Sequence, residues 1–321
     1  MKEKAGNNQQ PRVGGQAIIE GVMMRSPERV SAAVRLPDGN IEHRTWISKT
    51  WSKRNKITGL PVIRGAVSLA EALVLGIRTL NWSADIAMEH EKGKSEKKNG
   101  KRSSIGLSLT LVVAFILAIV LFMFVPYQLA SLLKTEENQP LFHLVAGSSR
   151  ILIFLAYVWL ISRMKDIQRV FEYHGSEHQA IYTYEKGLEL NPENAGLQSR
   201  LHPRCGTSFL LIVALSTMLL FIIFDIIVVA LWGSYPNVLV RLLVHLPFLP
   251  LVAGLSYELL RLSDRYSTTP LLRSLIVPGL ALQRLTTRPP DDSQREIAIF
   301  ALKSALNGDA CLEPEEHIDQ S

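Results

Sequence analysis

Four long apolar blocks constrain this chain more than any other feature of its sequence. Each block reaches the about 20 apolar residues that a helix needs to cross a bilayer. The expected spans are 105–126, 141–162, 208–232 and 238–260. Because the first block lies so far along the chain, it is not a secretory signal peptide. The sequence therefore predicts a mainly α-helical protein with four transmembrane helices, whose first partner is the lipid bilayer.

Basic residues predict the orientation of these spans. The segment 91–104 is rich in lysine, and the 163–207 connection and the tail after 262 each carry several arginines. The connections 127–140 and 233–237 hold one lysine between them. Since lysine and arginine gather on the cytoplasmic side, both termini and the 163–207 loop are expected in the cytoplasm. The net charge of +6 reflects this pattern, and without a recognition motif no nucleic-acid partner is expected.

The rest of the sequence divides around the spans into segments of different composition. Two strand-like runs, VSAAVRL and NIEHRTWI, are joined by the turn residues Pro37, Asp38 and Gly39. The predicted segments are an N-terminal cytoplasmic β-unit at 1–58, an amphipathic helix and charged linker at 59–104, two spans at 105–162, a cytoplasmic loop at 163–207, two spans at 208–262 and a helical C-terminal segment at 263–321. In the last segment, the run SQREIAIFALKSALNG is expected to form a helix that is capped by Asp291, Asp292 or Ser293 and ends at Gly308.

Glycines and one charge pair mark the beginning of the β-unit. Two interpretations are open for a group of residues here, namely Gly14, Gly15, Gly21 and a charge pair of Glu20 with Arg25. They either shape a functional loop, or they form an ordinary β-turn with a solvated ion pair.

The 59–90 run carries one narrow polar stripe on an otherwise apolar helix. Arg64, Glu71, Arg78 and Asp85 recur every seven residues, so they share one side of the helix. Such a helix can lie on the membrane surface, bury its stripe against the β-unit or enter the bilayer as a shallow re-entrant element. The simpler interpretation is a helix that packs against the rest of the protein and has a charged stripe along the contact.

The strongest chemical signal is the stretch FEYHGSEHQAIY. It is expected to continue the second span as a helix that ends at Gly187. On a helix His174 and His178 share one face, and two imidazoles at this spacing can bind one metal ion. Glu177 lies beside them, as in the H-x-x-E-H pattern of inverzincins, where a glutamate acts as base on a metal-bound water.

A third ligand must come from another segment. The run LHPRCGTSF offers His202 and Cys205, and two histidines with a further His or Cys form a plausible site for a divalent ion of the zinc type. The alternatives are a solvated helix face, or a hydrogen bond between His and Glu at the membrane interface. Cys205 and Cys311 are both expected in the cytoplasm, where a disulfide is not expected.

A second polar group falls inside the predicted spans, toward the outer leaflet. Intramembrane ionisable residues are costly and are usually paired. One interpretation is an Asp225–Arg241 pair that joins two helices, and the other is a polar pathway for a proton, an ion or a lipid headgroup. The residues of this intramembrane cluster are Asp225, Arg241, His245 and His143.

The fourth block contains two further signals. Pro247 and Pro250 are expected to break or kink the helix. At its inner end Glu258 and Arg261 lie three residues apart and are expected to pair on one helix face.

Five motifs together resemble one known family. They are GGQAIIEGVMMRSP, EYHGSEHQAI, HPRCGTSF, GLSYELLR and PGLALQRLTTRPPDDSQREIAIFAL. They resemble the YqhQ family, bacterial membrane proteins of unknown function that are often labelled predicted metal-dependent enzymes, over about 13–306. The resemblance implies the bacterial inner membrane and a metal-dependent enzyme, and it brings no established substrate or reaction.

Two function hypotheses follow. The first is a metal-dependent enzyme, of hydrolase type, that acts at the cytoplasmic face on a membrane-protein segment or a lipid headgroup. The second is a membrane transporter or scaffold in which the metal only holds the 163–207 loop together. Three protein ligands would favour the enzyme, and a closed set of four would favour the scaffold.

Overall fold

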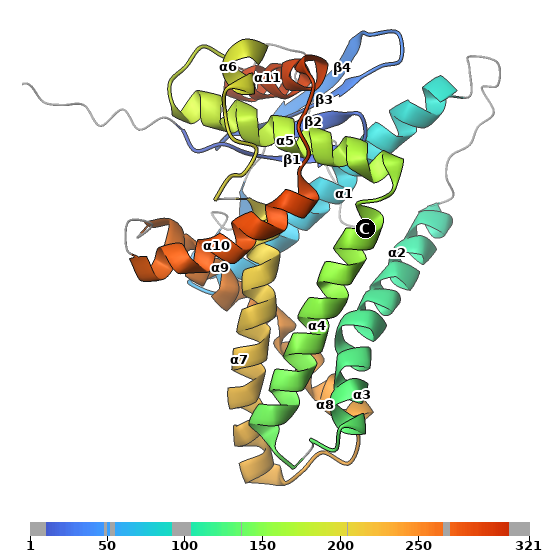
Figure 1. The fold of residues 1–321 in the computed structure, drawn as a ribbon, viewed down its shortest axis with the longest axis vertical. Helices are drawn as coiled ribbons and strands as arrows, with labels where there is room; N and C mark the ends of the chain where they lie inside the picture. Colours follow the sequence, from blue (N-terminus) through green and yellow to red (C-terminus); the bar gives the residue numbers. More distant parts are fainter. Residues whose placement is uncertain are drawn as a thin grey trace, which may run out of the picture.

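The helices form an upright bundle with a layer of strands and helices at one end (Figure 1). The computed structural model describes residues 11–47, 50–51, 55–91, 104–135, 137–203, 205–265 and 270–307. The side chains of 91, 104–111, 206–212, 214–215, 260–265 and 270–276 lie outside this description, as do Arg204 and Cys311.

The N-terminal segment forms a four-stranded antiparallel sheet whose strands follow the order of the chain. The predicted turn joins the last two strands, because Gly39 has a φ of +87° and its N–H donates to the Leu36 carbonyl at 2.9 Å. The strands are β1 (Gly14–Ile18), β2 (Gly21–Arg25), β3 (Arg29–Arg35) and β4 (Ile41–Ile47).

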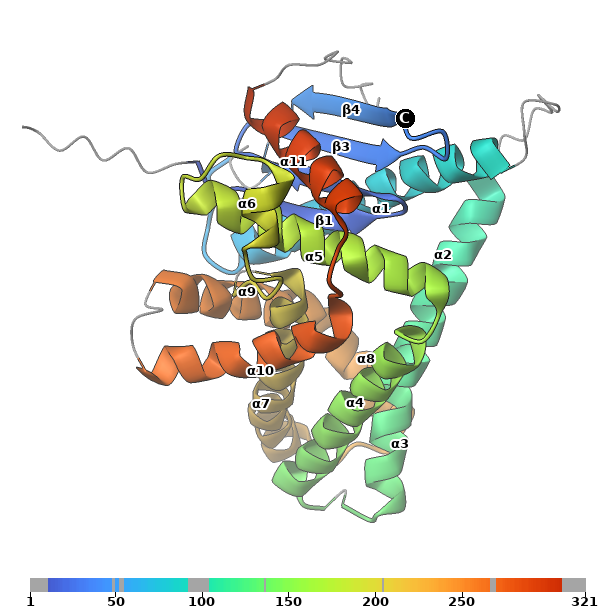
Figure 2. The ribbon, with the colours of Figure 1, turned by 45° about the horizontal axis from the view of Figure 1, so that its top comes forward.

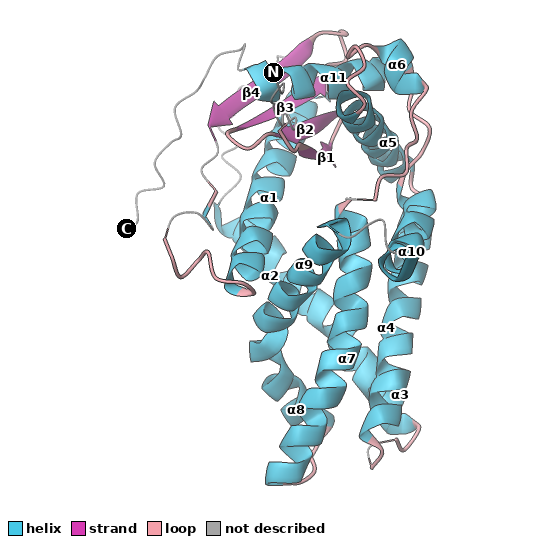
Figure 3. Cartoon of the chain, turned by 90° about the vertical axis from the view of Figure 1, so that its left-hand side faces the viewer, coloured by secondary structure: helices cyan, strands magenta, loops and turns pink. Residues whose placement is uncertain are grey.

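Helices cover both faces of the sheet (Figures 2 and 3). One face packs on α1 (Ile63–Glu91), and the other packs on α5 (Lys165–Glu185) and α11 (Asp292–Asn307). Side chains of a strand alternate between faces, so Val22 and Met24 join the core under α5 and α11, whereas Met23 joins the core under α1. The short α6 (Pro192–Gly196) borders the first of these cores.

The predicted loop around Glu20 is a β-hairpin, and the predicted Glu20–Arg25 pair is wrong. Glu20 lies in the two-residue turn between β1 and β2, whereas Arg25 ends β2, so the strand separates the two charges. Glu20 instead pairs with Arg169 of α5 at 2.5 Å, and Arg25 pairs with Glu71 of α1. Both charges therefore fix helices against the sheet.

The polar stripe of α1 is a charged seam between the sheet and the bundle. Glu71 pairs with Arg25 of the sheet, and Arg64 donates three hydrogen bonds to Glu258 of α9 (Leu249–Arg265), the shortest at 2.6 Å. The predicted pairing of Glu258 with Arg261 stays a prediction, because the Arg261 side chain lies outside the described residues.

Within the described residues, three helical stretches are long and apolar enough to cross a bilayer, namely Val112–Leu132, Gln139–Ile161 and Val238–Leu259. The fourth expected span lies in α7 (Gly206–Trp232), of which only the shorter apolar part Ser216–Trp232 has described side chains throughout. The remaining bundle elements are α2 (Ser104–Ile119), a π-helical turn (Val120–Phe124), α3 (Val125–Leu132), α4 (Gln139–Ile161), α8 (Val238–His245) and α10 (Pro270–Thr286).

The prolines interrupt regular helix at two places. A 3₁₀ turn at Leu246–Phe248 contains Pro247 and separates α8 from α9, as predicted. In the first span, Pro126 lacks the N–H that would bond the Phe122 carbonyl four residues earlier. Arg150 of α4 donates to that carbonyl at 2.7 Å, and this contact was not predicted from the sequence.

The expectation that α4 continues directly into α5 is wrong. The backbone is extended at Met164, where ψ is 132°, and a new helix begins at Lys165. Gln168 and Arg288 side chains both donate to the Ser162 carbonyl at 3.3 Å, which satisfies the end of α4. At its other end α5 stops as predicted, because Gly187 takes a φ of +65°.

The N-terminus of α11 is closed by a reciprocal cap. Asp291 accepts from the Gln294 N–H at 2.8 Å, and the Gln294 side chain accepts from the Asp291 N–H at 3.0 Å. This bears out the predicted cap, while the predicted stop at Gly308 lies outside the described residues.

Candidate metal centre

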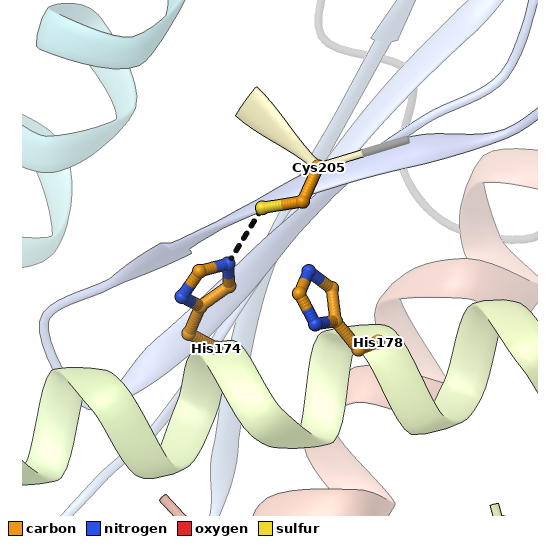
Figure 4. A group of neighbouring side chains, drawn as sticks. All are labelled: His174, His178 and Cys205. Atoms are coloured by element: carbon orange, nitrogen blue, oxygen red, sulfur yellow. Dashed lines mark hydrogen bonds between the residues drawn. The ribbon is translucent and has the colours of Figure 1, made fainter. Parts of the chain in front are cut away.

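Two histidines of α5 and the cysteine that precedes α7 meet at one point. In Figure 4 both imidazoles rise from α5 toward the Cys205 sulfur, and a dashed line joins His174 to that sulfur. The His174 Nε2–Cys205 Sγ distance is 3.1 Å, and the two imidazole centroids are 4.5 Å apart. One potential ligand atom from each of the three residues lies within 4.8 Å of the others. Two nitrogens and one sulfur at these distances can share one ion.

The outer nitrogen of each imidazole is held by a backbone carbonyl. His174 Nδ1 lies 2.8 Å from the Thr286 carbonyl oxygen, and His178 Nδ1 lies 2.5 Å from the Arg200 carbonyl oxygen. Because a carbonyl only accepts, each Nδ1 carries the proton, and in the neutral ring each Nε2 keeps its lone pair. Metal-bound histidines are oriented by outer contacts of this kind.

The inner nitrogen of His178 is buried, and it makes no hydrogen bond within the described part of the chain. Burial lowers the pKa of His178, although the Cys205 sulfur opposes this effect. The neutral imidazole that burial favours is also the form that binds metals. A buried acceptor without a hydrogen bond carries a desolvation cost, which a ligand ion would offset.

Glu177 lies beside His178 and is buried from solvent. Its Oε2 is 3.4 Å from His178 Nε2, and burial raises the pKa of the Glu177 carboxyl. His174, His202 and the Gly15 amide act against that rise. A raised pKa brings a carboxyl toward the range in which it can take up and release a proton.

Gly15 of β1 makes the position of Glu177 possible. A Cβ at residue 15 would lie 2.8 Å from Glu177 Oε1 and equally close to the Met23 carbonyl, so only glycine fits. The sequence marks Gly15 as a possible loop residue and gives no local link to Glu177, which lies far along the chain. The presence of both residues in the resemblance motifs was the available signal.

His202 borders this group and faces a different carboxylate. Its Nε2 is 3.4 Å from Glu185 Oε2, and its ring centroid is 5.7 Å from that of His178. Its backbone is held by Gln283, which accepts from the His202 N–H at 2.8 Å and donates to its carbonyl at 2.7 Å. The structure therefore brings Cys205 to the two α5 histidines and places His202 alongside.

The connection between α10 and α11 crosses α5 at the site. Gly175 permits this crossing, because a Cβ there would lie 2.2 Å from the Arg288 carbonyl oxygen. The Arg288 N–H donates to the Phe171 carbonyl at 2.9 Å, and Thr286 accepts from His174. This segment, LTTRPP, belongs to one of the five motifs of the family resemblance, although no role was predicted for it from the sequence.

The predicted intramembrane cluster forms around the Asp225 carboxylate. Asp225 is fully buried and accepts hydrogen bonds from His143, His245, Arg241 and Tyr235, at distances that include 2.6 Å to His143 Nε2 and 2.7 Å to His245 Nε2. Because a carboxylate only accepts, both Nε2 atoms carry a proton. With neutral imidazoles, the charges of Asp225 and Arg241 cancel.

Further side chains complete this cluster. Tyr127 Oη lies 2.9 Å from His245 Nδ1, and Gln139 accepts from Arg241. The cluster lies at the end of the bundle away from the sheet, where α4 begins and α7 ends (Figures 1 and 3). Such a saturated network favours a structural role over an open polar pathway. The two tyrosines of the cluster, Tyr127 and Tyr235, were not predicted from the sequence.

These features define a class of protein that is mainly helical, with a small antiparallel sheet and a partly buried His–Cys group, and with three helices of membrane-spanning length among the described residues. The chain belongs to the family described as "Protein of unknown function (DUF1385)", whose model matches residues 60–308. It is also 33% identical over 318 residues to "Uncharacterized protein YqhQ" of Bacillus subtilis (strain 168), which covers 95% of this chain and 96% of that protein. The resemblance to the YqhQ family is thus confirmed. No solved structure matches this chain.

Proposed function

We propose that this chain is a membrane protein that binds one zinc ion through His174, His178 and Cys205. The observation that carries the proposal is the orientation of the two imidazoles. Backbone carbonyls hold both Nδ1 atoms, which leaves both Nε2 atoms for a shared ligand beside the Cys205 sulfur. Imidazole nitrogen combined with thiolate sulfur favours zinc over harder ions such as magnesium.

Within this proposal the chain is an enzyme of hydrolase type. Three protein ligands leave one position of a tetrahedral zinc ion open, which is the arrangement of catalytic sites. When bound, zinc supplies a Lewis acid. Glu177 then serves as the group that takes up and releases a proton, because it is buried, its pKa is raised and it lies 3.4 Å from His178 Nε2.

A structural metal is the second candidate function. Glu177 and His202 both lie close enough to the group to be considered as a fourth ligand. With four protein ligands, the ion would have a structural role and would link α5 to the segment before α7. A transporter is the less favoured alternative, because every acceptor position of Asp225 described above already serves a neighbouring side chain.

Metal content tests the proposal. Purified full-length protein is expected to retain about one zinc ion per chain, and the double variant His174→Ala, His178→Ala is expected to retain almost none, since catalytic zinc needs about three protein ligands. The matched control is His90→Ala, which changes an exposed histidine at the end of α1. Equal zinc in the double variant and the control would contradict the proposal.

We also propose four membrane spans, with α7 as the fourth, and a cytoplasmic location for the sheet in a bacterial inner membrane. The support is the concentration of basic residues in the segments next to the sheet. Reporter fusions at Met1 and Ser321 are both expected to report the cytoplasm. An external signal from either end would reverse the orientation and place the metal centre outside the cell.

A further inference from the structure

The beginning of α1 lies level with the membrane helices. In Figure 3, α1 runs from the sheet down to the side of α9. The two backbones touch at a pair of glycines, where a Cβ at Gly65 would lie 2.7 Å from the Gly254 carbonyl oxygen. Gly254 belongs to the membrane-length stretch Val238–Leu259 and lies about 7.5 Å before its end along the helix axis, at 1.5 Å per residue. The first turn of α1 is therefore level with the last turns of a span.

The chain reaches this contact through a tight turn at 55–62, which the fold holds in place. The Thr58 N–H donates to Asn55 Oδ1 at 2.9 Å. Val62 has a φ of +70°, which is rare for a β-branched residue. Its carbonyl packs against Gly254, where a Cβ would overlap it. Backbone strain of this kind persists only where the surrounding structure imposes it, so the turn is a built part of the molecule.

This turn presents large apolar side chains on its outside. Ile57 is 66% exposed, Leu60 is 51% exposed and Ile63, the first residue of α1, is 40% exposed. Lys56, which is also exposed, lies beside them. Contiguous exposed apolar side chains mark interaction surfaces, and a neighbouring cation is typical of segments that lie on anionic membranes. We call residues 55–63 the apolar tip.

The charged residues next to the apolar tip are paired with each other. Arg64 pairs with Glu258 at 2.6 Å, and Glu258 directly precedes Leu259, the last residue of the span. Both side chains of this pair keep about a quarter of their surface exposed. A paired charge at the end of a span is compatible with the membrane interface, so Arg64 does not prevent insertion of its apolar neighbours.

We propose that the apolar tip inserts into the lipid leaflet on the sheet side of the membrane and anchors α1 there. Interfacial segments bury their apolar side chains about 5–10 Å deep, which agrees with the level of Gly254. Lipid is the occupant, because the apolar tip is continuous with the outer surface of α9, where Leu251 and Leu259 are exposed as well. Since α1 packs on the sheet, this anchor fixes the height of the sheet layer above the membrane.

Site-specific photo-crosslinking tests this inference on the full-length protein. The photoreactive residue p-benzoylphenylalanine replaces Leu60, and the protein is reconstituted into vesicles of phosphatidylethanolamine and phosphatidylglycerol. Two matched proteins carry the same residue at Leu117, which is exposed in the first span, or at Leu197, which is exposed at the end of α6 in the sheet layer. After irradiation, mass spectrometry of proteolytic peptides measures the yield of lipid adducts.

The probe at Leu60 is expected to behave like the probe in the span. Its lipid adducts should be about as frequent as those at Leu117. They should be about tenfold more frequent than those at Leu197, which is the preference of a leucine-sized side chain for an apolar environment over water.

A pair of variants tests whether the apolar side chains drive insertion. Ile57→Asp together with Ile63→Asp places two charges on the apolar tip, and an acidic residue is suited to the first turn of a helix. With the probe at Leu60, this double variant is expected to lose about tenfold in lipid adducts, because charged side chains are disfavoured in the membrane. The control Leu188→Asp, at an exposed leucine of the sheet layer, is expected to change nothing.

Three outcomes overturn the inference. Lipid adducts at Leu60 that are no more frequent than at Leu197 would place the apolar tip in water. Adducts that join two copies of the chain, in place of lipid adducts, would make the apolar tip a contact between proteins. Equal lipid adducts in the double aspartate variant and the Leu188→Asp control would show that the apolar side chains do not hold the tip in the membrane.

Discussion

Asp225→Asn is expected to destabilise the folded protein by about 3–5 kcal/mol, the usual cost of removing one partner of a buried ion pair. The change leaves Arg241 buried without its counter-charge, although its contact with Gln139 remains. It also presents an amide N–H₂ group to donors that now bond to a carboxylate, including His143 and Tyr235. Thermal unfolding in detergent, followed by size-exclusion chromatography of the folded fraction, measures the loss.

Two further proteins make this test specific. The double variant Asp225→Asn, Arg241→Gln is expected to recover only part of the lost stability, because the histidines still lack their acceptor. Glu137→Gln, at an exposed acid nearby, is the control and should change stability by less than about 0.5 kcal/mol. If the double variant were as unstable as the sum of the two single variants, the buried Asp225–Arg241 pair would contribute nothing.

Gly175→Ala is expected to destabilise the protein by about 1–3 kcal/mol, the cost of overpacking a rigid contact. The new methyl group would lie 2.2 Å from the Arg288 carbonyl oxygen, and backbone cannot rotate away as a side chain can. α5 and the connection between α10 and α11 must therefore separate.

The same change is expected to weaken zinc binding about 10- to 100-fold, as losses of outer contacts to metal ligands do. The displaced connection follows directly on Thr286, the last residue of α10, whose carbonyl holds His174. The control is Gly196→Ala, where the methyl group would lie 3.6 Å from the Arg295 side chain, an ordinary contact. If the Ala variants at 175 and 196 matched in both zinc affinity and melting temperature, the crossing would not position the site.

The sequence predicts features that depend on local patterns. The turn at Pro37–Gly39, the end of α5 at Gly187 and the cap at Asp291 follow from the conformational preferences of single residues. Three of the four expected spans have the required length and composition. The shared face of His174 and His178 follows from the helical repeat alone.

The sequence does not predict features that depend on tertiary packing. The break before α5 has no proline to mark it, and it exists because α5 must turn to cover the sheet. Arg25 pairs with Glu71 and not with Glu20, because distant elements meet where neighbours in the sequence do not. The approach of Gly15 to Glu177 joins residues from opposite halves of the chain, so no local pattern indicates it.

X-ray absorption at the zinc edge, on purified full-length protein, tests the central claim most directly. The account predicts a shell of nitrogen neighbours at about 2.0 Å and one sulfur neighbour at about 2.3 Å from the zinc ion. Cys205→Ser is expected to remove the sulfur shell and to keep the nitrogen shell from His174 and His178. A zinc spectrum without sulfur in the unmodified protein, or one unchanged by the double variant His174→Ala, His178→Ala, would contradict the account.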